Sequence, residues 1–344
     1  MTQLEALLHA EYFTLSRNHG PVSLLPRLSS HARMRSRLPA IRPPVGRRAL
    51  SSGARVQQSK GPNGVVTVRL CRPDKLNSLD MHMFRAIASC ARSLAADRSV
   101  RAVVLHGEGR AFCAGLDVKN VNNPMHARAN LAELLDRPEG AISNLAQDVS
   151  YLWRRVPAPV IVATHGVCIG GGFQIALGAD MRISTPNCKF SIMEAKWGLI
   201  PDMGGTVVLP ELVPKDVAME LTMTGRIFDG AEALSLGLIT RISDDPLTEA
   251  QHLAAEIAAR SPDSTAAAKR LLDATYTESD DKRKLHLETA LQRRLLGGWN
   301  QLACSAKGLG FPVALTPGFL QRSKEWSAEA DEKAEAELRA MLDS

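Results

Sequence analysis

Long apolar runs are absent from this sequence of 344 residues, and none approaches the ~20 residues that a membrane-spanning helix requires. The sequence therefore predicts no membrane span. Cysteine is scarce: the six cysteines form no Cys-x-x-Cys pair, and no histidine stands at a zinc-ligand spacing from them. No His-Glu-x-x-His sequence occurs either. These absences argue against a bound metal and a disulfide framework, and they favour a reducing compartment.

Acidic residues are few at the N-terminus. Residues 1–58 contain nine arginines, no lysine and only two acids, Glu5 and Glu11, so this segment carries the excess behind the net charge of +6. The remainder is close to neutral, and we expect no nucleic-acid partner. An arginine-rich, acid-poor segment is typical of a mitochondrial transit peptide, which would direct the protein to the mitochondrial matrix. The two early glutamates leave an unstructured extension as the alternative.

The chain beyond this segment alternates between strand-like and helix-like patterns. β-branched or alternating runs that suit single strands occur at 64–70, 100–106, 160–163, 181–184 and 188–191. Helical spacing predicts a helix that starts near Asp80 and a helical segment over 124–155. We therefore expect an α/β core with parallel crossovers over residues 59–245, followed by a helical region over 246–344.

Three consecutive glycines, Gly170 to Gly172, follow the apolar run at 160–163 and precede a helix-like segment. Glycine lets a ligand approach the main chain, and a helix N-terminus presents N–H groups, so this turn can stabilise negative charge without a basic side chain. The glycines do not form Gly-x-Gly-x-x-Gly, and no Lys-Ser or Lys-Thr follows them, which disfavours nucleotide binding. A tight strand-to-helix crossing without a ligand is the alternative for this motif alone.

A second glycine turn occurs in AFCAGLDVKN at residues 111–120. Gly115 allows a sharp turn that could present the N–H of Leu116. Together with Gly171, the chain then offers two backbone donors, as an oxyanion hole requires, and each such donor is worth about 3 kcal/mol of transition-state stabilisation. Cys113 lies in the same segment, but no base is near it in the sequence, so we expect it to pack and not to act as a nucleophile.

Four motifs occur in order along the chain: RPDKLNSLD, RAFCAGLDVK, GVCIGGGFQIALGADMRI and MEAKWGLIPDMGG. Over roughly residues 60–320 they resemble the crotonase superfamily of enoyl-CoA hydratases and isomerases. The resemblance implies an α/β fold of the ClpP/crotonase type, a spiral of ββα units, with a C-terminal helical region that forms trimer contacts. It also implies a trimer or a dimer of trimers, an acyl-CoA thioester substrate, and no metal or redox cofactor, because coenzyme A enters as part of the substrate.

The resemblance assigns roles to residues by position. Leu116 and Gly171 would supply the two N–H groups that hold the thioester oxygen. Contacts with coenzyme A or the substrate would come from Lys75, Asn77, Gly115, Leu116, Asp117, Val118, Lys119 and Gly171. Family hydratases use two glutamates, of which Glu194 matches the later one. Gln174 stands in place of the earlier one, and an amide takes up no proton at physiological pH.

The two acids of the last motif, Glu194 and Asp202, favour an isomerase. Dienoyl-CoA isomerases of the family pair a glutamate with an aspartate at these two positions, and some Δ3-Δ2 isomerases keep only the glutamate. Removing a proton beside a thioester carbonyl creates an enolate, so a carboxylate at the carbon complements two donors at the oxygen. We therefore expect Glu194 and Asp202 to transfer protons, and Gln174 to position them, in an isomerase of fatty-acid β-oxidation.

Three alternatives remain open from the sequence. The first is hydration with Glu194 and Asp202 as the catalytic pair, or another crotonase chemistry. The second is an acyl-CoA-binding protein without activity. The third concerns Asp202 alone, which follows Pro201 and could be an ordinary turn residue.

Overall fold

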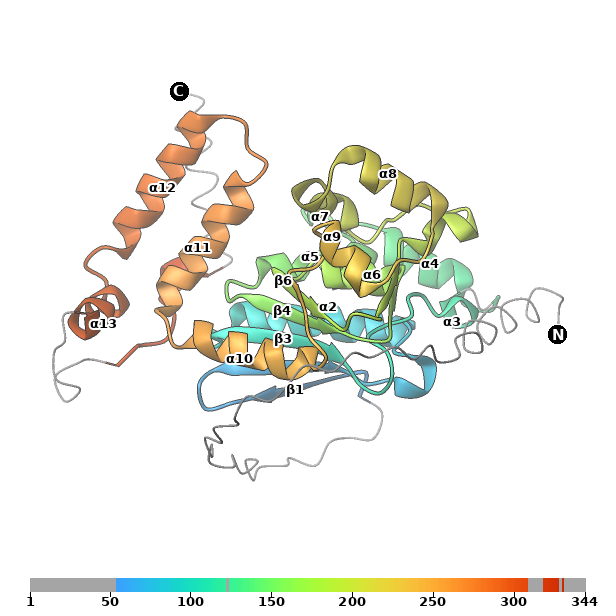
Figure 1. Cartoon of the computed structure of the whole chain (residues 1–344), viewed down its shortest axis with the longest axis horizontal. Helices are drawn as coiled ribbons and strands as arrows, with labels where there is room; N and C mark the ends of the chain where they lie inside the picture. The colour runs from blue at the N-terminus through green and yellow to red at the C-terminus, as the bar shows by residue number, and fades with distance from the viewer. Residues whose placement is uncertain (1–53, 122–123, 309–317, 328–329, 331–344) are drawn as a thin grey trace, which may run out of the picture. The chain divides into compact units, whose positions relative to one another are not determined.

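The computed structural model describes residues 54–121, 124–308, 318–327 and 330 (Figure 1). Most of the expected N-terminal segment, residues 1–53, and the end of the expected helical region, residues 331–344, lie outside the described residues. Strand β1 (Val56–Lys60) begins before residue 59, where we expected the core to start. Arg55, just before β1, forms an ion pair of 2.6 Å with Asp80, so the folded part already includes the last residues of the 1–58 segment.

The main sheet has six strands in the order β1-β2-β3-β4-β6-β8. After β1 these strands are β2 (Val65–Leu70), β3 (Ala102–Gly107), β4 (Val160–Thr164), β6 (Met181–Ser184) and β8 (Arg241–Ile242). Only β1 and β2 pair in antiparallel fashion, and the other neighbours are parallel. Strand β4 is buried at every residue, as expected for a central parallel strand that is covered on both faces.

A smaller parallel sheet is formed by β5 (Val167–Ile169) and β7 (Lys189–Ser191). Single bridges extend it, from Cys113 to Cys168 on one side and from Phe190 to Phe228 on the other. Each of its first three segments follows a strand of the main sheet, namely β3, β4 and β6. This repeated step from the main sheet to the small sheet confirms the expected spiral of ββα units.

Helices surround the sheets (Figure 1). They are α2 (Met81–Ala96), α3 (Val118–Val121), α4 (Ala127–Leu135), α5 (Leu145–Arg155), α6 (Gly171–Leu177), α7 (Gly205–Leu212), α8 (Lys215–Thr224), α9 (Gly230–Ser235) and α10 (Pro246–Ala258), with short 3-10 turns η1 (Pro73–Lys75) and η2 (Met193–Trp197). The expected helix near Asp80 is confirmed, since the Asp80 side chain caps α2 by accepting the Met83 N–H at 2.8 Å.

The two faces of the main sheet are packed by different helices because successive strand residues point to opposite sides. One face packs its side chains against two alanines of α10, in a cluster of Ala102, Val104, Ile161, Ala163, Ile183, Ala250 and Ala254. The alternating residues Val103, Leu105 and Val162 belong to the larger core, which also contains Phe84 of α2 and Trp153 of α5. The small side chains on the α10 face allow that helix to lie close to the strands.

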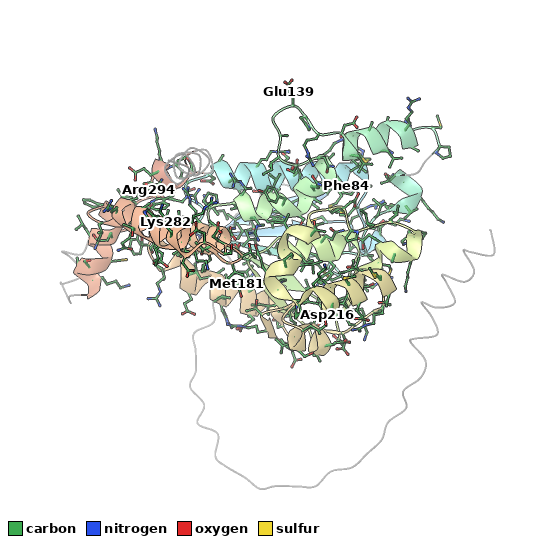
Figure 2. All side chains as sticks on the ribbon, turned by 90° about the horizontal axis from the view of Figure 1, so that it is seen from above. Phe84, Glu139, Met181, Asp216, Lys282 and Arg294 are labelled. Carbon is green, nitrogen blue, oxygen red and sulfur yellow. The ribbon has the colours of Figure 1, made fainter. Side chains whose placement is uncertain are left out.

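The segment 124–155, expected to be helical throughout, contains two helices, α4 and α5, with a loop between them. Pro138 lies in this loop, and proline disfavours helical backbone in the residue before it. The side chain of Asn144 then starts α5 by accepting the Gln147 N–H at 2.9 Å, and Gln147 completes the capping box. Figure 2 shows Glu139 at the tip of the loop, pointing away from the fold.

The helical C-terminal region is confirmed over the described residues. Helix α10 is followed by α11 (Pro262–Thr275), α12 (Asp281–Leu295), α13 (Trp299–Gly308) and the 3-10 turn η4 (Lys324–Trp326). This region has a small core of its own, formed by Ala266, Ala267, Leu287, Leu291 and Trp326. No helix in the described part of the chain is both long and apolar enough to cross a membrane.

Candidate active site

The two glycine turns predicted to hold an anion lie next to each other. Gly115 has a positive φ of 82°, and a Cβ at this residue would lie 2.9 Å from the Ile169 carbonyl oxygen and 3.5 Å from the Gly171 nitrogen. Only glycine allows this backbone conformation together with this close approach. The two turns are adjacent because Cys113, just before Gly115, pairs with Cys168 of the small sheet, just before Gly170.

The backbone on both sides of Leu116 is held by pairing with Leu79. The Leu79 N–H donates to the Gly115 carbonyl at 2.8 Å, and the Asp117 N–H donates to the Leu79 carbonyl at 3.0 Å. Within the described part of the chain, neither the Leu116 N–H nor the Gly171 N–H donates a hydrogen bond. The Leu116 and Gly171 N–H groups, which we expected to form an oxyanion hole, therefore both lack an acceptor among the described residues, and the two turns that carry them are adjacent.

A different physical constraint explains why glycine occurs at each of the positions 170, 171 and 172. Gly170 has a φ of 52° and donates its N–H to the Ser191 carbonyl at 2.9 Å. A Cβ on Gly171 would lie 2.8 Å from Met203 Sδ, so Met203 closes the space over the turn. A Cβ on Gly172 would lie 2.4 Å from the Cys113 carbonyl oxygen, so Gly172 is needed for packing of α6. Only the first two therefore face the candidate site.

Glu194 and Gln174 are brought together from η2 and α6. The Gln174 Nε2 donates to Glu194 Oε1 at 2.7 Å, and the Gln174 Oε1 accepts the N–H groups of Met203 and Gly205 at 2.9 and 3.0 Å. Glu194 Oε1 lies 3.9 Å from the Cβ position of Gly170, so the carboxylate is beside the glycine turn. The Gln174 amide thus links the Glu194 carboxylate to the backbone of the residues that follow Asp202.

The electrostatic environment favours protonation of both acids. Burial raises the pKa of Glu194, the negative charge of Asp202 raises it further, and the hydrogen bond from Gln174 opposes the rise. Partial burial of its carboxylate also raises the pKa of Asp202, which lies in the loop between η2 and α7. Glu194 Oε2 is buried and has no hydrogen-bond partner among the described residues. A buried carboxylate oxygen without a partner, beside the turn that is predicted to bind an anion, is suited to exchange a proton with a ligand.

Asn77 was expected to contact coenzyme A, but its side chain is fully used within the protein. It is completely buried, its Oδ1 accepts the Arg72 N–H at 2.8 Å, and its Nδ2 donates to the carbonyls of Glu108 and Ala111 at 2.9 Å each. Its φ of 55° places it in the left-handed region, which asparagine tolerates better than most residues. The Asn77 side chain therefore holds the first loop together and is not available to a ligand.

Among the other residues expected around coenzyme A, Lys75 and Lys119 are exposed, Leu116, Asp117 and Val118 are half-buried, and Gly115 and Gly171 are buried. Lys75 is exposed in η1, and Val118 and Lys119 begin α3. Asp117 forms an ion pair of 2.8 Å with Arg72, a residue that the sequence reasoning missed. Arg72 also lies 3.5 Å from Asp80, so it joins the first motif to the Leu116 turn. The available signal was a basic residue at the start of that motif, but its partner is distant in the sequence.

Cys113 packs as expected. It is fully buried, its Sγ donates to the Asn77 carbonyl at 3.1 Å, and burial raises the pKa of its thiol to about 12. A thiol in this environment is not a nucleophile at neutral pH.

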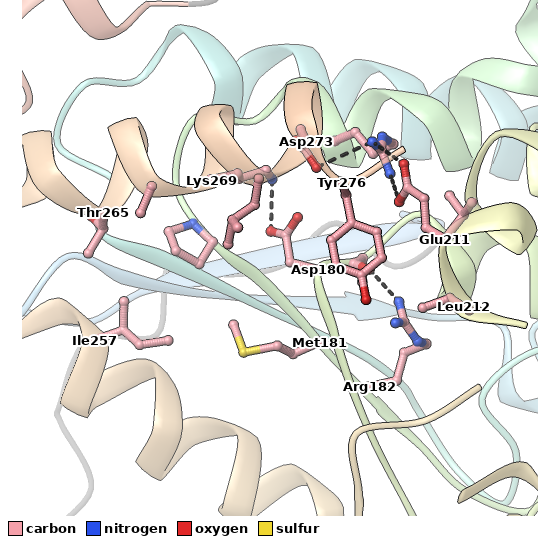
Figure 3. A pocket seen from close by; sticks show the side chains of 16 residues that line it. Asp180, Met181, Arg182, Glu211, Leu212, Ile257, Thr265, Lys269, Asp273 and Tyr276 are labelled. Atoms are coloured by element: carbon pink, nitrogen blue, oxygen red, sulfur yellow. Dashed lines mark hydrogen bonds and ion pairs between the residues drawn. The ribbon is translucent and has the colours of Figure 1, made fainter. Parts of the chain in front are cut away.

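A cavity of about 430 Å³ contains none of the predicted site residues (Figure 3). It lies near Asp180, beyond the C-terminal end of α6, whereas Gly171 is at the start of that helix. Ion pairs line it: Lys269 contacts Asp180 at 2.8 Å, and Arg154 contacts Glu211 at 2.8 Å and Asp273 at 3.3 Å. The two Arg154 pairs tie α5 to α7 and to α11, and the Lys269 pair ties α11 to the residue before β6. Burial raises the pKa of Asp273 to about 6.

Comparison with known proteins agrees with the sequence motifs. Residues 60–297 match the family described as enoyl-CoA hydratase/isomerase. The chain is 33% identical to a 1,2-epoxyphenylacetyl-CoA isomerase of Escherichia coli (strain K12), over 67% of this chain and 86% of that protein. It is 30% identical to a mitochondrial Delta(3,5)-Delta(2,4)-dienoyl-CoA isomerase of Rattus norvegicus, over 60% of this chain and 65% of that protein.

A solved structure of an enoyl-CoA hydratase from Mycobacterium smegmatis has the same fold, with a TM-score of 0.64 and 28% sequence identity. The similarity covers 74% of this chain and 96% of that one. With the ββα spiral and the family match over residues 60–297, these similarities show that the chain belongs to the enoyl-CoA hydratase/isomerase family.

Proposed function

We propose that the protein is an acyl-CoA isomerase that shifts a carbon–carbon double bond in fatty-acid β-oxidation, from Δ3 to Δ2 in an enoyl-CoA or from Δ3,5 to Δ2,4 in a dienoyl-CoA. The observation that carries the proposal is the 2.7 Å hydrogen bond from Gln174 to Glu194. Family hydratases have a second glutamate at the Gln174 position, and an amide cannot replace it as a base. Bond migration needs no water, so one carboxylate can perform it.

The proposed reaction is a pair of proton transfers. Glu194 removes a proton from C2 of the thioester, and the electrons move into an enolate whose oxygen is held by the N–H groups of Leu116 and Gly171. The proton then returns to C4 of an enoyl chain or C6 of a dienoyl chain, either from Glu194 or with help from Asp202. No atom is gained or lost and the oxidation level is unchanged, so the reaction requires no redox cofactor. The two N–H groups would stabilise the enolate oxygen in place of a metal, and coenzyme A is part of the substrate.

Apolar side chains support an acyl substrate. Trp197, Leu199 and Ile200 lie between the two acids in the sequence and are exposed. A hydrocarbon chain bound near Glu194 would gain about 25 cal/mol for each Å² of apolar surface that it removes from water here.

A panel of thioesters tests the proposal. Purified protein is incubated separately with 3-enoyl-CoA, 3,5-dienoyl-CoA and 2-enoyl-CoA, and the products are identified by mass spectrometry and absorbance. We expect conjugated 2-enoyl or 2,4-dienoyl products. A 3-hydroxyacyl product as the sole outcome would refute the isomerase.

Hydration is the second candidate function, and the electrostatic effect of Asp202 on Glu194 favours it, because two nearby carboxylates can share one water. The same panel decides, since hydration consumes 2-enoyl-CoA. Binding of all three thioesters without any turnover would instead identify an acyl-CoA-binding protein without activity.

Location and assembly complete the proposal. The arginine-rich residues 1–58 and the mitochondrial rat relative support a location in the mitochondrial matrix, which a fluorescent fusion with and without these residues would test.

The C-terminal helices support self-association as a trimer or a dimer of trimers. Analytical ultracentrifugation would contradict this if the protein sedimented as a monomer at micromolar concentration.

A further inference from the structure

The orientation of the Gln174 side-chain amide is determined by its neighbours. Two backbone N–H groups, from Met203 and Gly205, approach the same side-chain atom at 2.9 and 3.0 Å. Both are donors, so the atom that they face must be the amide oxygen. The amide NH₂ must therefore face Glu194, and Gln174 can only donate to that carboxylate.

This orientation makes the two oxygens of Glu194 unequal. Oε1 accepts the Gln174 N–H at 2.7 Å, and a proton on Oε1 would point at another proton. Oε2 is buried and has no hydrogen-bond partner among the described residues. A proton carried by Glu194 therefore resides on Oε2.

The Gln174 amide also holds Met203, the residue that lies against the glycine turn. Its oxygen holds the backbone of Met203, whose Sδ lies 2.8 Å from the Cβ position of Gly171. Asp202 directly precedes Met203, and its negative charge raises the pKa of Glu194. Gln174 thus donates a hydrogen bond to Glu194 directly. Through Met203 it also contacts the loop that contains Asp202, and Met203 in turn lies against Gly171 of the predicted oxyanion site.

We propose that Gln174 is a positioning residue that restricts proton transfer to Oε2 of Glu194 and thereby selects isomerisation over hydration. This inference rests on the proposed function. In the reaction, the C2–H bond breaks as the Oε2–H bond forms, and the same proton then leaves Oε2 to form the C–H bond at the distal carbon. Because Oε2 is buried, the proton returns to the substrate before it exchanges with water.

A glutamate at position 174 would change this arrangement. Its carboxylate could still accept from Met203 and Gly205, so the loop would keep its hydrogen bonds. It would, however, place a second negative charge at hydrogen-bond distance from Glu194, and two such carboxylates share one proton. The Gln174→Glu variant therefore separates the acceptor role of the amide from its donor role.

Titration of Glu194 tests the inference without relying on activity. Carboxyl carbons of ¹³C-labelled glutamate are followed by NMR from pH 4 to 9, and Glu194→Gln identifies the signal. We expect the midpoint of Glu194 to rise by about one pH unit in Gln174→Met, because one hydrogen bond to the charged form is lost. The control Gln58→Met, at an exposed residue of β1, should leave the midpoint unchanged. An unchanged midpoint in folded Gln174→Met would overturn the inference.

Isotope transfer tests the same inference during turnover. With substrate deuterated at C2, we expect the wild-type product to retain most of the label at the distal carbon in ordinary water. Gln174→Glu should lower this retention at least twofold and produce 3-hydroxyacyl-CoA from 2-enoyl-CoA, while Gln58→Glu should do neither. Circular dichroism confirms folding, and Gln174→Glu keeps the loop acceptor if Gln174→Met does not fold. Normal retention in Gln174→Glu would refute the inference alone, whereas a wild type without isomerised product would refute the proposed function.

Discussion

The Gly171 nitrogen lies 3.5 Å from the point that a Cβ on Gly115 would occupy. These two glycines belong to separate turns, and the small sheet brings the turns into contact. Neither of the adjoining N–H groups, of Leu116 and Gly171, is used by the described residues. Two unused donors on neighbouring turns are what we expect of a site for a single oxygen that gains negative charge.

Gly171→Ala should reduce catalysis without unfolding the protein. Its methyl would lie 2.8 Å from Met203 Sδ and 2.9 Å from Leu79 Cδ1, which are ends of flexible side chains, so the cost falls on the site. Alanine keeps the backbone N–H, but its methyl would displace Met203 and Leu79 beside that N–H. We therefore expect kcat/KM to fall at least ~100-fold, about as much as the loss of one oxyanion donor would cost, with little change in Tm.

Gly172→Ala is the matched control for this prediction. Its methyl would lie 2.4 Å from the Cys113 carbonyl oxygen, which cannot move without shifting the strand. Here Tm should drop, as measured by differential scanning calorimetry. Wild-type kcat/KM in Gly171→Ala would contradict the placement of the oxyanion site.

Glu194→Gln and Asp202→Asn test proton transfer. Each should lower kcat at least ~100-fold if its carboxylate carries a proton, while substrate affinity measured by calorimetry should change little. Asp216→Asn, on the exposed surface of α8 (Figure 2), is the control and should keep full activity. If Asp202→Asn is fully active and Glu194→Gln is not, then Asp202 is an ordinary turn residue and Glu194 alone carries the proton.

The activity should depend on pH through Glu194. Burial and the charge of Asp202 raise its pKa, so the carboxylate stays protonated to a higher pH than an ordinary glutamate. Because the base must be ionised, kcat/KM should rise with pH through this raised pKa and then level off. Asp202→Asn removes a negative charge and should move the rise to lower pH, in whatever activity remains. A midpoint that does not move would show that the two acids are not coupled.

Asp273 should make stability depend on pH. Burial raises its pKa from the ordinary aspartate value of 3.8 to about 6, so the folded state binds this proton more tightly than the unfolded state. The stabilising contribution is complete below about pH 4 and is lost as pH rises through 6. From pH 5 to 7 we expect a loss of about 1 kcal/mol in the free energy of unfolding that is absent in Asp273→Asn.

Urea unfolding at the two pH values measures this contribution of Asp273. The exposed Asp281→Asn of α12 serves as the control, because it should respond to pH as the wild type does. Equal responses of wild type and Asp273→Asn would contradict the prediction.

The strands and the C-terminal helices follow from local patterns. Strands β3 and β4 are apolar and β-branched, and parallel strands that are covered on both faces need that composition. Strand β5 has only three residues and was not among the expected strands, and β1 lies in a segment whose composition indicated a leader. Pro138 could have divided the helical segment 124–155, but helical spacing alone did not place the break.

The sequence by itself determined the family, the α/β class, the two glycine turns and the identity of the two acids, because these depend on residue type and order. Tertiary structure alone decided that Asn77 is a buried loop support and that Gln174 bridges Glu194 to the backbone of Met203 and Gly205. Both facts depend on hydrogen bonds between residues that are 20 or more positions apart. Such bonds leave no period or spacing in the chain, so only the folded arrangement could show which oxygen of Glu194 is left without a partner.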